Sequence, residues 1–232
     1  LHRFGGSVIS FSGDAITCWF DGDDGLRATT CALAMQTAMG QFTAVSTPSG
    51  SEVELAMKTA VAAGPARRFL VGDPDIQLID VLAGATLEHL AAAEKKALKN
   101  EVILDSATSA KLERNASFTV WRKDSFTTNQ NGVVNTLKSA GQPTPWAETA
   151  LGSFDEAASQ SWLLPDIYDR LQNGRGEFLA ELRPAVALFL RFSGLEYDTD
   201  PEAGDKLDQF VRQVQKILTH YESNLLQLTI GD

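Results

Sequence analysis

The chain has 232 residues, of which 44% are hydrophobic and 22% charged, a composition typical of a soluble globular protein. Its formal net charge of -10 argues against a general nucleic-acid-binding protein and against a protein that binds anionic membranes. It contains no run of about eighteen apolar residues, so no membrane span is expected. The length provides material for one or two hydrophobic cores.

Both cysteines, Cys18 and Cys31, lie in segments predicted to be regular structure. Buried free thiols in a reducing compartment are therefore favoured over a disulfide bridge. The protein is therefore expected to be cytoplasmic.

The first predicted element is a β-hairpin with strands over residues 8–11 and 15–20 and with Gly13 and Asp14 in its turn. A turn of this kind holds one carboxylate at a fixed point, which suits half of a metal site. The alternative is that Gly-Asp only forms the turn. A second apolar run, residues 225–230, precedes Gly231 and Asp232 and repeats the pattern.

Residues 21–25 hold three aspartates and two glycines, a composition that also occurs in calcium-binding loops. The spacing of these aspartates is too short for such a loop, and no glutamate follows at the required distance. The segment is instead predicted to be the acidic N-terminal flank of a helix over residues 26–42.

The pattern then predicts a series of strands and helices with a polar interruption. The strands are expected over 53–63, 69–71, 76–83, 102–104 and 118–121, and the helices over 84–98 and 106–112. Residues 43–52 are predicted to be a loop. Residues 123–149 are rich in Asn, Gln, Ser, Thr, Gly and Pro and are predicted to be a linker or excursion.

The last third of the chain predicts a second unit. It comprises a short helix over 165–173, an apolar strand over 185–192, a long amphipathic helix over 201–221 and a strand over 225–230. The order of elements predicts two α/β sandwich domains in tandem, the first with a mainly antiparallel sheet. Because the chain begins without Met and stops in a turn signal, it is expected to be a piece of a longer protein, with two incomplete domains.

Three stretches, residues 11–20, 84–105 and 181–190, resemble class III nucleotidyl cyclases, with the tandem soluble adenylyl cyclase type the most similar. The resemblance implies an α+β sandwich with a ferredoxin-like fold. It also implies the boundaries: residues 1–122 as the back part of a first cyclase domain, 123–177 as a linker, and 178–232 as the front part of a second.

The implied activity is that of a phosphorus–oxygen lyase in intracellular signalling. It converts a nucleoside triphosphate, with ATP expected but not distinguished from GTP, to a 3′,5′-cyclic nucleotide and pyrophosphate. Two divalent ions, Mg²⁺ or Mn²⁺, assist the reaction in this family. The resemblance further implies that the first and second cyclase domains pair with each other.

Two residues carry the implied site. Asp14 matches the carboxylate of the family's hairpin that holds the metal ions, and its partner carboxylate is expected before Leu1. Asp80 lies near the position that contacts the purine base; the alternative is a solvent-facing aspartate at a strand end.

Several positions depart from the family pattern. Arg191 stands where the second domain would carry a metal-binding carboxylate, and Glu88 and Ala92 stand where the family has the Asn and Arg that stabilise the transition state. Either the second domain supplies the missing groups, or the parent is a catalytically dead pseudo-cyclase pair with a regulatory or scaffolding role. The chain by itself is expected to be inactive.

Other candidate residues have less support from the sequence. Ser10 and Ala91 align with the family's bicarbonate-sensing positions, and neither is basic, so bicarbonate activation is not expected. The three histidines lack metal-type spacing and are predicted to lie on surfaces or helix faces.

Overall fold

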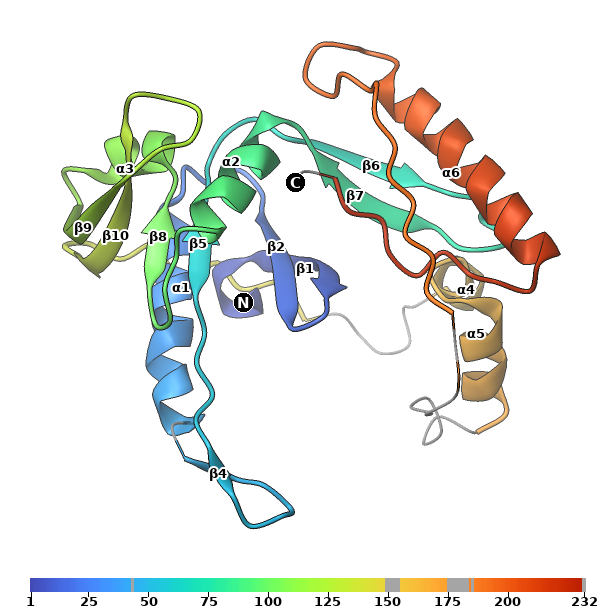
Figure 1. The fold of residues 1–232 in the computed structure, drawn as a ribbon, viewed down its shortest axis with the longest axis horizontal. Helices are drawn as coiled ribbons and strands as arrows, with labels where there is room; N and C mark the ends of the chain where they lie inside the picture. Colours follow the sequence, from blue (N-terminus) through green and yellow to red (C-terminus); the bar gives the residue numbers. More distant parts are fainter. Residues whose placement is uncertain (43, 149–154, 175–183, 185, 231–232) are drawn as a thin grey trace. The chain divides into compact units, whose positions relative to one another are not determined.

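The computed structural model describes residues 1–42, 44–148, 155–174, 184 and 186–230 (Figure 1). Contacts divide the chain into two compact units. Unit 1 contains Leu1–Ala66, Ala83–Ala147 and the end of the chain from Ile230; unit 2 contains Arg67–Leu82 and Glu148–Thr229. Both units combine helices with strands, so the fold class is mixed α/β, as predicted.

Unit 1 is built around a four-stranded sheet with the strand order β5-β8-β10-β9. β5 and β8 are parallel, whereas β10 is antiparallel to both of its neighbours, which confirms the expected mainly antiparallel sheet. The strands are β5 (Thr59–Val61), β8 (Val102–Leu104), β9 (Ala116–Lys123) and β10 (Gln130–Leu137).

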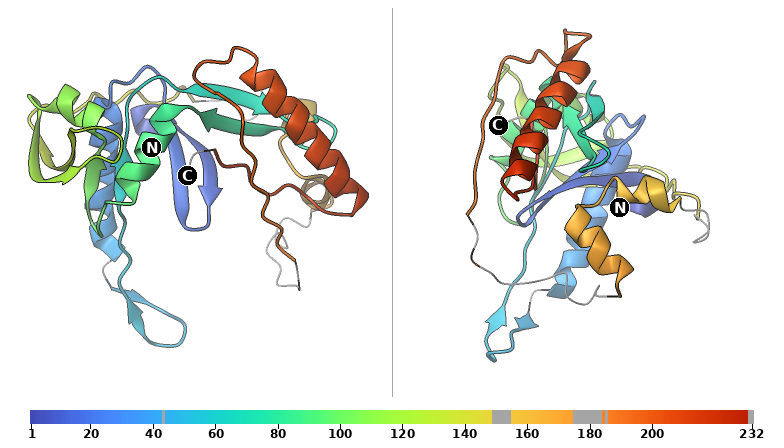
Figure 2. Two further views of the ribbon diagram at one scale, coloured as in Figure 1. Left: turned by 45° about the horizontal axis from the view of Figure 1, so that its top comes forward. Right: turned by 90° about the vertical axis from the view of Figure 1, so that its right-hand side faces the viewer.

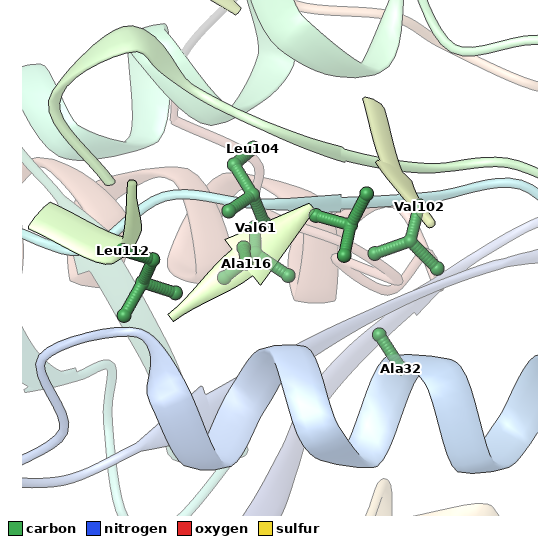
Figure 3. Close-up of a cluster of buried hydrophobic side chains, with 7 residues drawn as sticks. Ala32, Val61, Val102, Leu104, Leu112 and Ala116 are labelled. Carbon is green, nitrogen blue, oxygen red and sulfur yellow. The ribbon is translucent and has the colours of Figure 1, made fainter. Parts of the chain in front are cut away.

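The three residues of β8 divide the core of unit 1 between two sides of the sheet. Leu104, like Val102, packs in a cluster with Ala32 of α1 (Figure 3). Ile103 packs with Ala93 of α2. This alternation follows from the two-residue repeat of a strand, and it explains why β8 is apolar throughout. The helices are α1 (Leu26–Met39), α2 (Ala85–Glu94) and α3 (Ser106–Leu112).

Two small hairpins complete unit 1. β1 (Gly6–Ser12) and β2 (Ala15–Phe20) pair antiparallel and confirm the predicted hairpin. β3 (Val45–Ser46) and β4 (Glu52–Val53) form a short hairpin in the predicted loop. Single turns of 3₁₀ helix, His2–Phe4 and Gly40–Phe42, precede β1 and follow α1.

In the part that the structure describes, unit 2 contains one hairpin and three helices. Its elements are β6 (Arg67–Val71), β7 (Ile79–Ala83), α4 (Glu156–Gln160), α5 (Pro165–Gln172) and α6 (Ala203–His220). α6 lies along β6 (Figure 2). The buried residues of α6 recur every four positions, which is the spacing of one helix face: Ala203, Leu207, Val211 and Gln215.

The segment predicted as a linker contains a central strand. β10 pairs with β8 on one side and β9 on the other, and its Val133 and Val134 are 4% and 6% exposed. The linker prediction was wrong for these residues because Val133 and Val134 are a short apolar signal within a segment of mostly polar residues. α4 and α5 also lie between residues 123 and 177. The predicted boundaries at residues 122 and 177 separate regions that resemble cyclase domains, whereas the compact units are defined by contacts within the structure. These boundaries therefore stay a prediction.

Three strand predictions were wrong in extent or existence. Of residues 53–63, only Thr59–Val61 enters the four-stranded sheet. No strand forms in the described residues 186–192 or in 225–230. Val186 and Phe189 of the first segment are 98% and 95% exposed. A β-prone run becomes a strand only where a neighbouring strand accepts its hydrogen bonds. Ala185, Gly231 and Asp232 lie outside the described residues.

Within the described part of the chain, none of the helices is both long and apolar enough to cross a bilayer.

Candidate functional site

Asp14 lies at the exposed tip of the β1–β2 hairpin. Ser12 pairs with Ala15, so Gly13 and Asp14 form the two-residue loop between them. Gly13 has φ +62°, a conformation that glycine adopts without steric cost. The local sequence therefore fixes the position of the Asp14 backbone and leaves its side chain exposed.

Asp14 alone does not make a metal centre. Among the described residues, no group of three or more His, Cys, Asp or Glu side chains is arranged to hold a metal ion. A divalent ion of the magnesium type takes six ligands, some of them waters and substrate phosphates. Asp14 fits the role of one carboxylate ligand, and a complete site needs further ligands.

The acidic segment before α1 caps that helix. The Asp23 carboxylate accepts hydrogen bonds from the backbone N–H groups of Arg27 at 3.1 Å and Ala28 at 2.8 Å. Asp24 accepts from the N–H of Leu26 at 3.1 Å. These carboxylates satisfy N–H groups that have no partner inside the helix, which confirms the helix-flank interpretation.

Asp80, predicted near the purine position, lies in β7 and pairs with Arg68 of β6. Arg68 Nε donates to Asp80 Oδ1 at 2.8 Å and to Oδ2 at 3.0 Å, and its Nη2 also contacts Oδ2. The Asp80 side chain is 15% exposed. Both carboxylate oxygens thus have a partner within the hairpin, and the purine role stays a prediction. Asp14 and Asp80 belong to different compact units.

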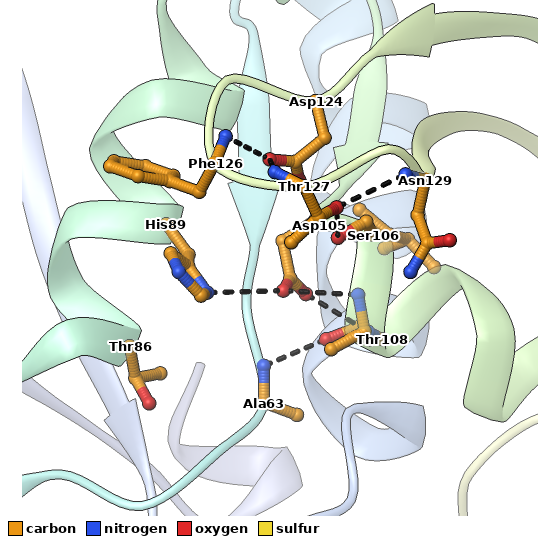
Figure 4. A network of polar contacts seen from close by, with 12 residues as sticks. Ala63, Thr86, His89, Asp105, Ser106, Thr108, Asp124, Phe126, Thr127 and Asn129 are labelled. Carbon is orange, nitrogen blue, oxygen red and sulfur yellow. Dashed lines mark hydrogen bonds and ion pairs between the residues drawn. The ribbon is translucent and has the colours of Figure 1, made fainter.

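A polar network surrounds Asp105 at the end of β8 (Figure 4). Asp105 is 2% exposed and caps α3: its Oδ1 accepts from the N–H of Thr108 at 3.0 Å and its Oδ2 from the N–H of Ala107 at 3.2 Å. An aspartate directly before a helical segment is a recognisable N-cap signal. The sequence therefore held the information to place Asp105, although not to place its other neighbours.

Elements distant in sequence meet at Asp105. His89 of α2 has its Nδ1 4.0 Å from Asp105 Oδ2. The hydroxyl of Thr108 accepts a 2.7 Å hydrogen bond from the N–H of Ala63, beyond the end of β5. The spacing of the histidines did not reveal the contact between His89 and Asp105, because it depends on how α2 packs on the sheet.

The loop between β9 and β10 borders this network. The Phe126 ring lies 4.9 Å from the His89 ring, centroid to centroid. Asp124 Oδ1 accepts from the N–H of Phe126 at 2.6 Å and of Thr127 at 3.1 Å. Burial acts to raise the pKa of Asp124, but hydrogen bonds from these N–H groups and from Ser106 outweigh it and hold the pKa below its ordinary value.

The positions that depart from the cyclase pattern are spread over several parts of the chain. Glu88 is exposed on α2, and Ala91 and Ala92 are half-buried on the same helix. Ser10 lies in β1, and Arg191 is exposed in a segment without regular structure.

Comparisons with known proteins give structural similarity without sequence matches. No family description and no curated protein matches the chain. The guanylate cyclase domain of RhGC from Catenaria anguillulae, solved with GTP, is 16% identical with a TM-score of 0.47; the match covers 59% of this chain and 75% of that one.

Two further solved structures are similar. The guanylyl cyclase Cya2 is 18% identical with a TM-score of 0.47, covering 60% of this chain and 73% of that one. The adenylyl cyclase CyaB from P. aeruginosa is 15% identical with a TM-score of 0.44, covering 60% and 76%. TM-scores below 0.5 do not by themselves establish a shared fold or activity. Over about three fifths of its length, this chain is similar in structure to a set of adenylyl and guanylyl cyclases.

Proposed function

We propose that this chain is part of a cytoplasmic class III nucleotidyl cyclase of the tandem, soluble type. The whole enzyme converts a nucleoside triphosphate, expected to be ATP, to a 3′,5′-cyclic nucleotide and pyrophosphate. Its two cyclase domains pair with each other. Mg²⁺ or Mn²⁺ ions supply charge stabilisation for the attacking and leaving oxygens. Asp14 is one carboxylate ligand of these ions.

The hairpin tip is the observation that carries this proposal. β1 and β2 place Asp14 at a defined loop position and leave its carboxylate exposed. The hairpin also exposes two large apolar side chains that face each other across the strands, Phe11 at 64% and Ile16 at 54%. Such exposed apolar surface next to a candidate ligand supports a second domain closing over the site.

The second candidate is a catalytically dead pseudo-cyclase pair that acts as a regulatory or scaffolding module. Glu88 and Ala92 favour it, because neither side chain donates hydrogen bonds to a developing negative charge. Arg191 also favours it, since a guanidinium does not ligate a metal ion. On either candidate the chain by itself is expected to make no cyclic nucleotide, because Asp14 is the one candidate metal ligand among its described residues and Glu88 and Ala92 stand at the positions of the donor pair.

Binding of the Mn²⁺–ATP complex tests the role of Asp14. Electron paramagnetic resonance on a longer protein that contains this chain with both cyclase domains compares wild type, Asp14→Asn and the control Asp21→Asn, an exposed aspartate that follows β2. Asn fits the turn but lacks the charge, so we expect about tenfold weaker binding by Asp14→Asn, equivalent to about 1.4 kcal/mol. Equal affinities of the three proteins contradict a ligand role.

Turnover separates the two candidates. In a longer protein that contains this chain with both cyclase domains, the cyclase candidate predicts cyclic nucleotide formation that Asp14→Asn abolishes and Asp21→Asn preserves. Nucleotide binding with no product in wild type supports the pseudo-cyclase. Turnover that survives Asp14→Asn contradicts the proposed site in both forms.

A further inference from the structure

Residues 140–147, called the strap here, follow β10 without forming a helix or a strand. Two hydrogen bonds hold the strap on unit 1. The N–H of Gly141 donates a 2.8 Å bond to the hydroxyl of Thr30 in α1, and the indole N–H of Trp146 donates a 2.9 Å bond to the carbonyl of Gly6 in β1. The residues between these two bonds are therefore held on the surface of unit 1.

Thr144 lies in the strap between Pro143 and Pro145. Because the ring of a following proline disfavours the helical conformation, Thr144 is held extended. Residues 142–147 are all exposed. A protein kinase binds the residue that it phosphorylates within an extended, accessible peptide, and a proline-directed kinase also requires proline directly after that residue. Thr144 meets these three conditions.

The other Thr-Pro pair of the chain, Thr47 and Pro48, has a different environment. Thr47 is half-buried between β3 and β4, where its N–H donates to the carbonyl of Ser51 at 2.8 Å and its carbonyl accepts from the N–H of Gly50 at 2.9 Å. Its hydroxyl lies 2.9 Å from that of Ser49 and 2.8 Å from that of Ser51. The hairpin must open before a kinase can bind this pair in an extended form.

The Thr144 hydroxyl has close neighbours that oppose a phosphate. Arg27 Nη1 donates a 2.9 Å bond to Thr144 Oγ1, and a Cβ at Gly5 would lie 2.9 Å from the same oxygen. The Arg27 guanidinium also bonds to the carbonyl of Asp21, and its Nε lies 3.7 Å from Asp23 Oδ1. Asp23 already offsets the charge of Arg27, so a phosphate of charge about −1.5 to −2 at Thr144 is both crowded and repelled.

We propose that Thr144 is a phosphorylation site for a proline-directed protein kinase, and that phosphate there releases the strap from α1 and β1. In this reaction Thr144 Oγ1 attacks the γ-phosphorus of ATP. The new O–P bond forms as the bond from that phosphorus to the β–γ bridging oxygen breaks, ADP leaves, and the hydroxyl proton passes to the kinase. No step uses Asp14, so this proposal is judged separately from the proposed cyclase site.

The rates of phosphorylation of the two threonines test the site. The purified chain is incubated with ATP and a mitogen-activated or a cyclin-dependent protein kinase, and its phosphopeptides are quantified by mass spectrometry. Synthetic peptides of residues 140–148 and 44–52 measure the preference of each kinase without the fold. We expect the ratio of the Thr144 rate to the Thr47 rate to be at least about tenfold larger in the chain than in the peptides, because several hydrogen bonds hold Thr47.

Two variants serve as controls for this measurement. Thr144→Val keeps the shape of the side chain without the hydroxyl and should lack the phosphate on the strap. Pro145→Ala keeps the hydroxyl and should slow phosphorylation of Thr144 strongly. The proposal is overturned if neither kinase modifies Thr144, or if the rate ratio is the same in the chain and in the peptides.

Hydrogen exchange then tests release of the strap. The N–H groups of Gly141 and Trp146 are hydrogen-bonded in the unmodified strap, the second to the carbonyl of His2 at 3.3 Å. We expect both to exchange at least about tenfold faster after phosphorylation of Thr144. Thr144→Val treated with the same kinase should exchange as before treatment. Unchanged or slower exchange in the phosphorylated chain overturns the proposal, because it shows that the phosphate leaves the strap in place.

Discussion

The caps that Asp23, Asp105 and Asp124 form in unit 1 differ from the contact between α6 and the β6–β7 turn in unit 2 in the sequence distance that their hydrogen bonds span. In unit 1, Asp23, Asp105 and Asp124 accept hydrogen bonds from N–H groups two to five residues further along the chain. In unit 2, Asp208 and Gln215 bond to a turn that lies 136 to 142 residues earlier.

This difference separates local order from long-range order. A cap formed within five residues closes a small loop and is available as soon as its helix or turn forms. A bond across about 140 residues forms only after the chain has closed a large loop, and it depends on the packing of α6 against β6. We therefore expect unit 2 to respond to changes in its long-range contacts more than unit 1 responds to changes in its caps.

The largest expected effect comes from core truncation. Leu104 in β8 and Leu207 in α6 are both 0% exposed. Each change to Ala should lower the free energy of unfolding of its own unit by about 2–5 kcal/mol. Urea denaturation followed by hydrogen-exchange mass spectrometry measures both. If Leu104→Ala increases exchange in residues 203–220 as much as in 102–137, the two units do not unfold separately and the comparison is wrong.

Removal of the long-range amide should come next. Gln215→Ala leaves the N–H of Asp73 and the carbonyl of Gln77 without their partner and should cost about 1–3 kcal/mol, with faster exchange restricted to residues 67–82 and 203–220. Gln213→Ala, on the exposed side of α6, should cost under about 0.5 kcal/mol. A similar loss from both variants shows that helix propensity, and not recognition of the turn, stabilises unit 2.

The local cap in unit 1 should matter less. Asp105→Ala removes the acceptor for two N–H groups of α3 and should cost about 0.5–2 kcal/mol. Asp105→Asn keeps a capping oxygen and should cost less, since Asn caps as well as Asp. Urea midpoints of the two variants provide the test. Equal losses in the two variants point to the His89 contact as the main role of this carboxylate, because both variants remove its charge and only Asn keeps a capping oxygen.

A smaller effect is expected from acid. The pKa of Asp124 is lower in the folded protein than in the unfolded chain, so the folded state binds fewer protons. The contribution of Asp124 to the free energy of unfolding is fully present above the pKa of the unfolded chain, near pH 4. It is lost as the pH falls through the lower pKa of the folded protein. Asp124→Asn keeps an acceptor but does not titrate. We expect the variant to lose less stability than wild type between about pH 6 and pH 3 in urea denaturation. Parallel losses contradict this.

The smallest effect on stability should come from Asp14. Asp14→Asn replaces one exposed turn residue with another that suits the turn, and it should change the free energy of unfolding by under about 0.5 kcal/mol. A thermal melt checks this alongside the Mn²⁺–ATP measurement. A large loss of stability would show that Asp14 has a structural role at the hairpin tip.

Local signals in the sequence predicted much of unit 1. The Gly13–Asp14 turn, the acidic flank of α1, the apolar strand β8 and helix α3 were confirmed, because each depends on hydrogen bonds or burial patterns within a few residues. The same signals failed for β10, whose polar sequence becomes a strand because β8 and β9 lie on either side of it. They failed again for the apolar residues 186–192, which have no strand neighbour in the described part of the chain.

The sequence by itself determined where turns and caps form and which carboxylate stands at the exposed hairpin tip, since short-range hydrogen bonding and glycine geometry decide these features. Only the tertiary structure decided which distant segments meet: His89 with Asp105, Arg68 with Asp80, and α6 with the turn after β6. These contacts arise from the packing of whole elements against one another. A side chain's own neighbours in the sequence carry no information about such a partner.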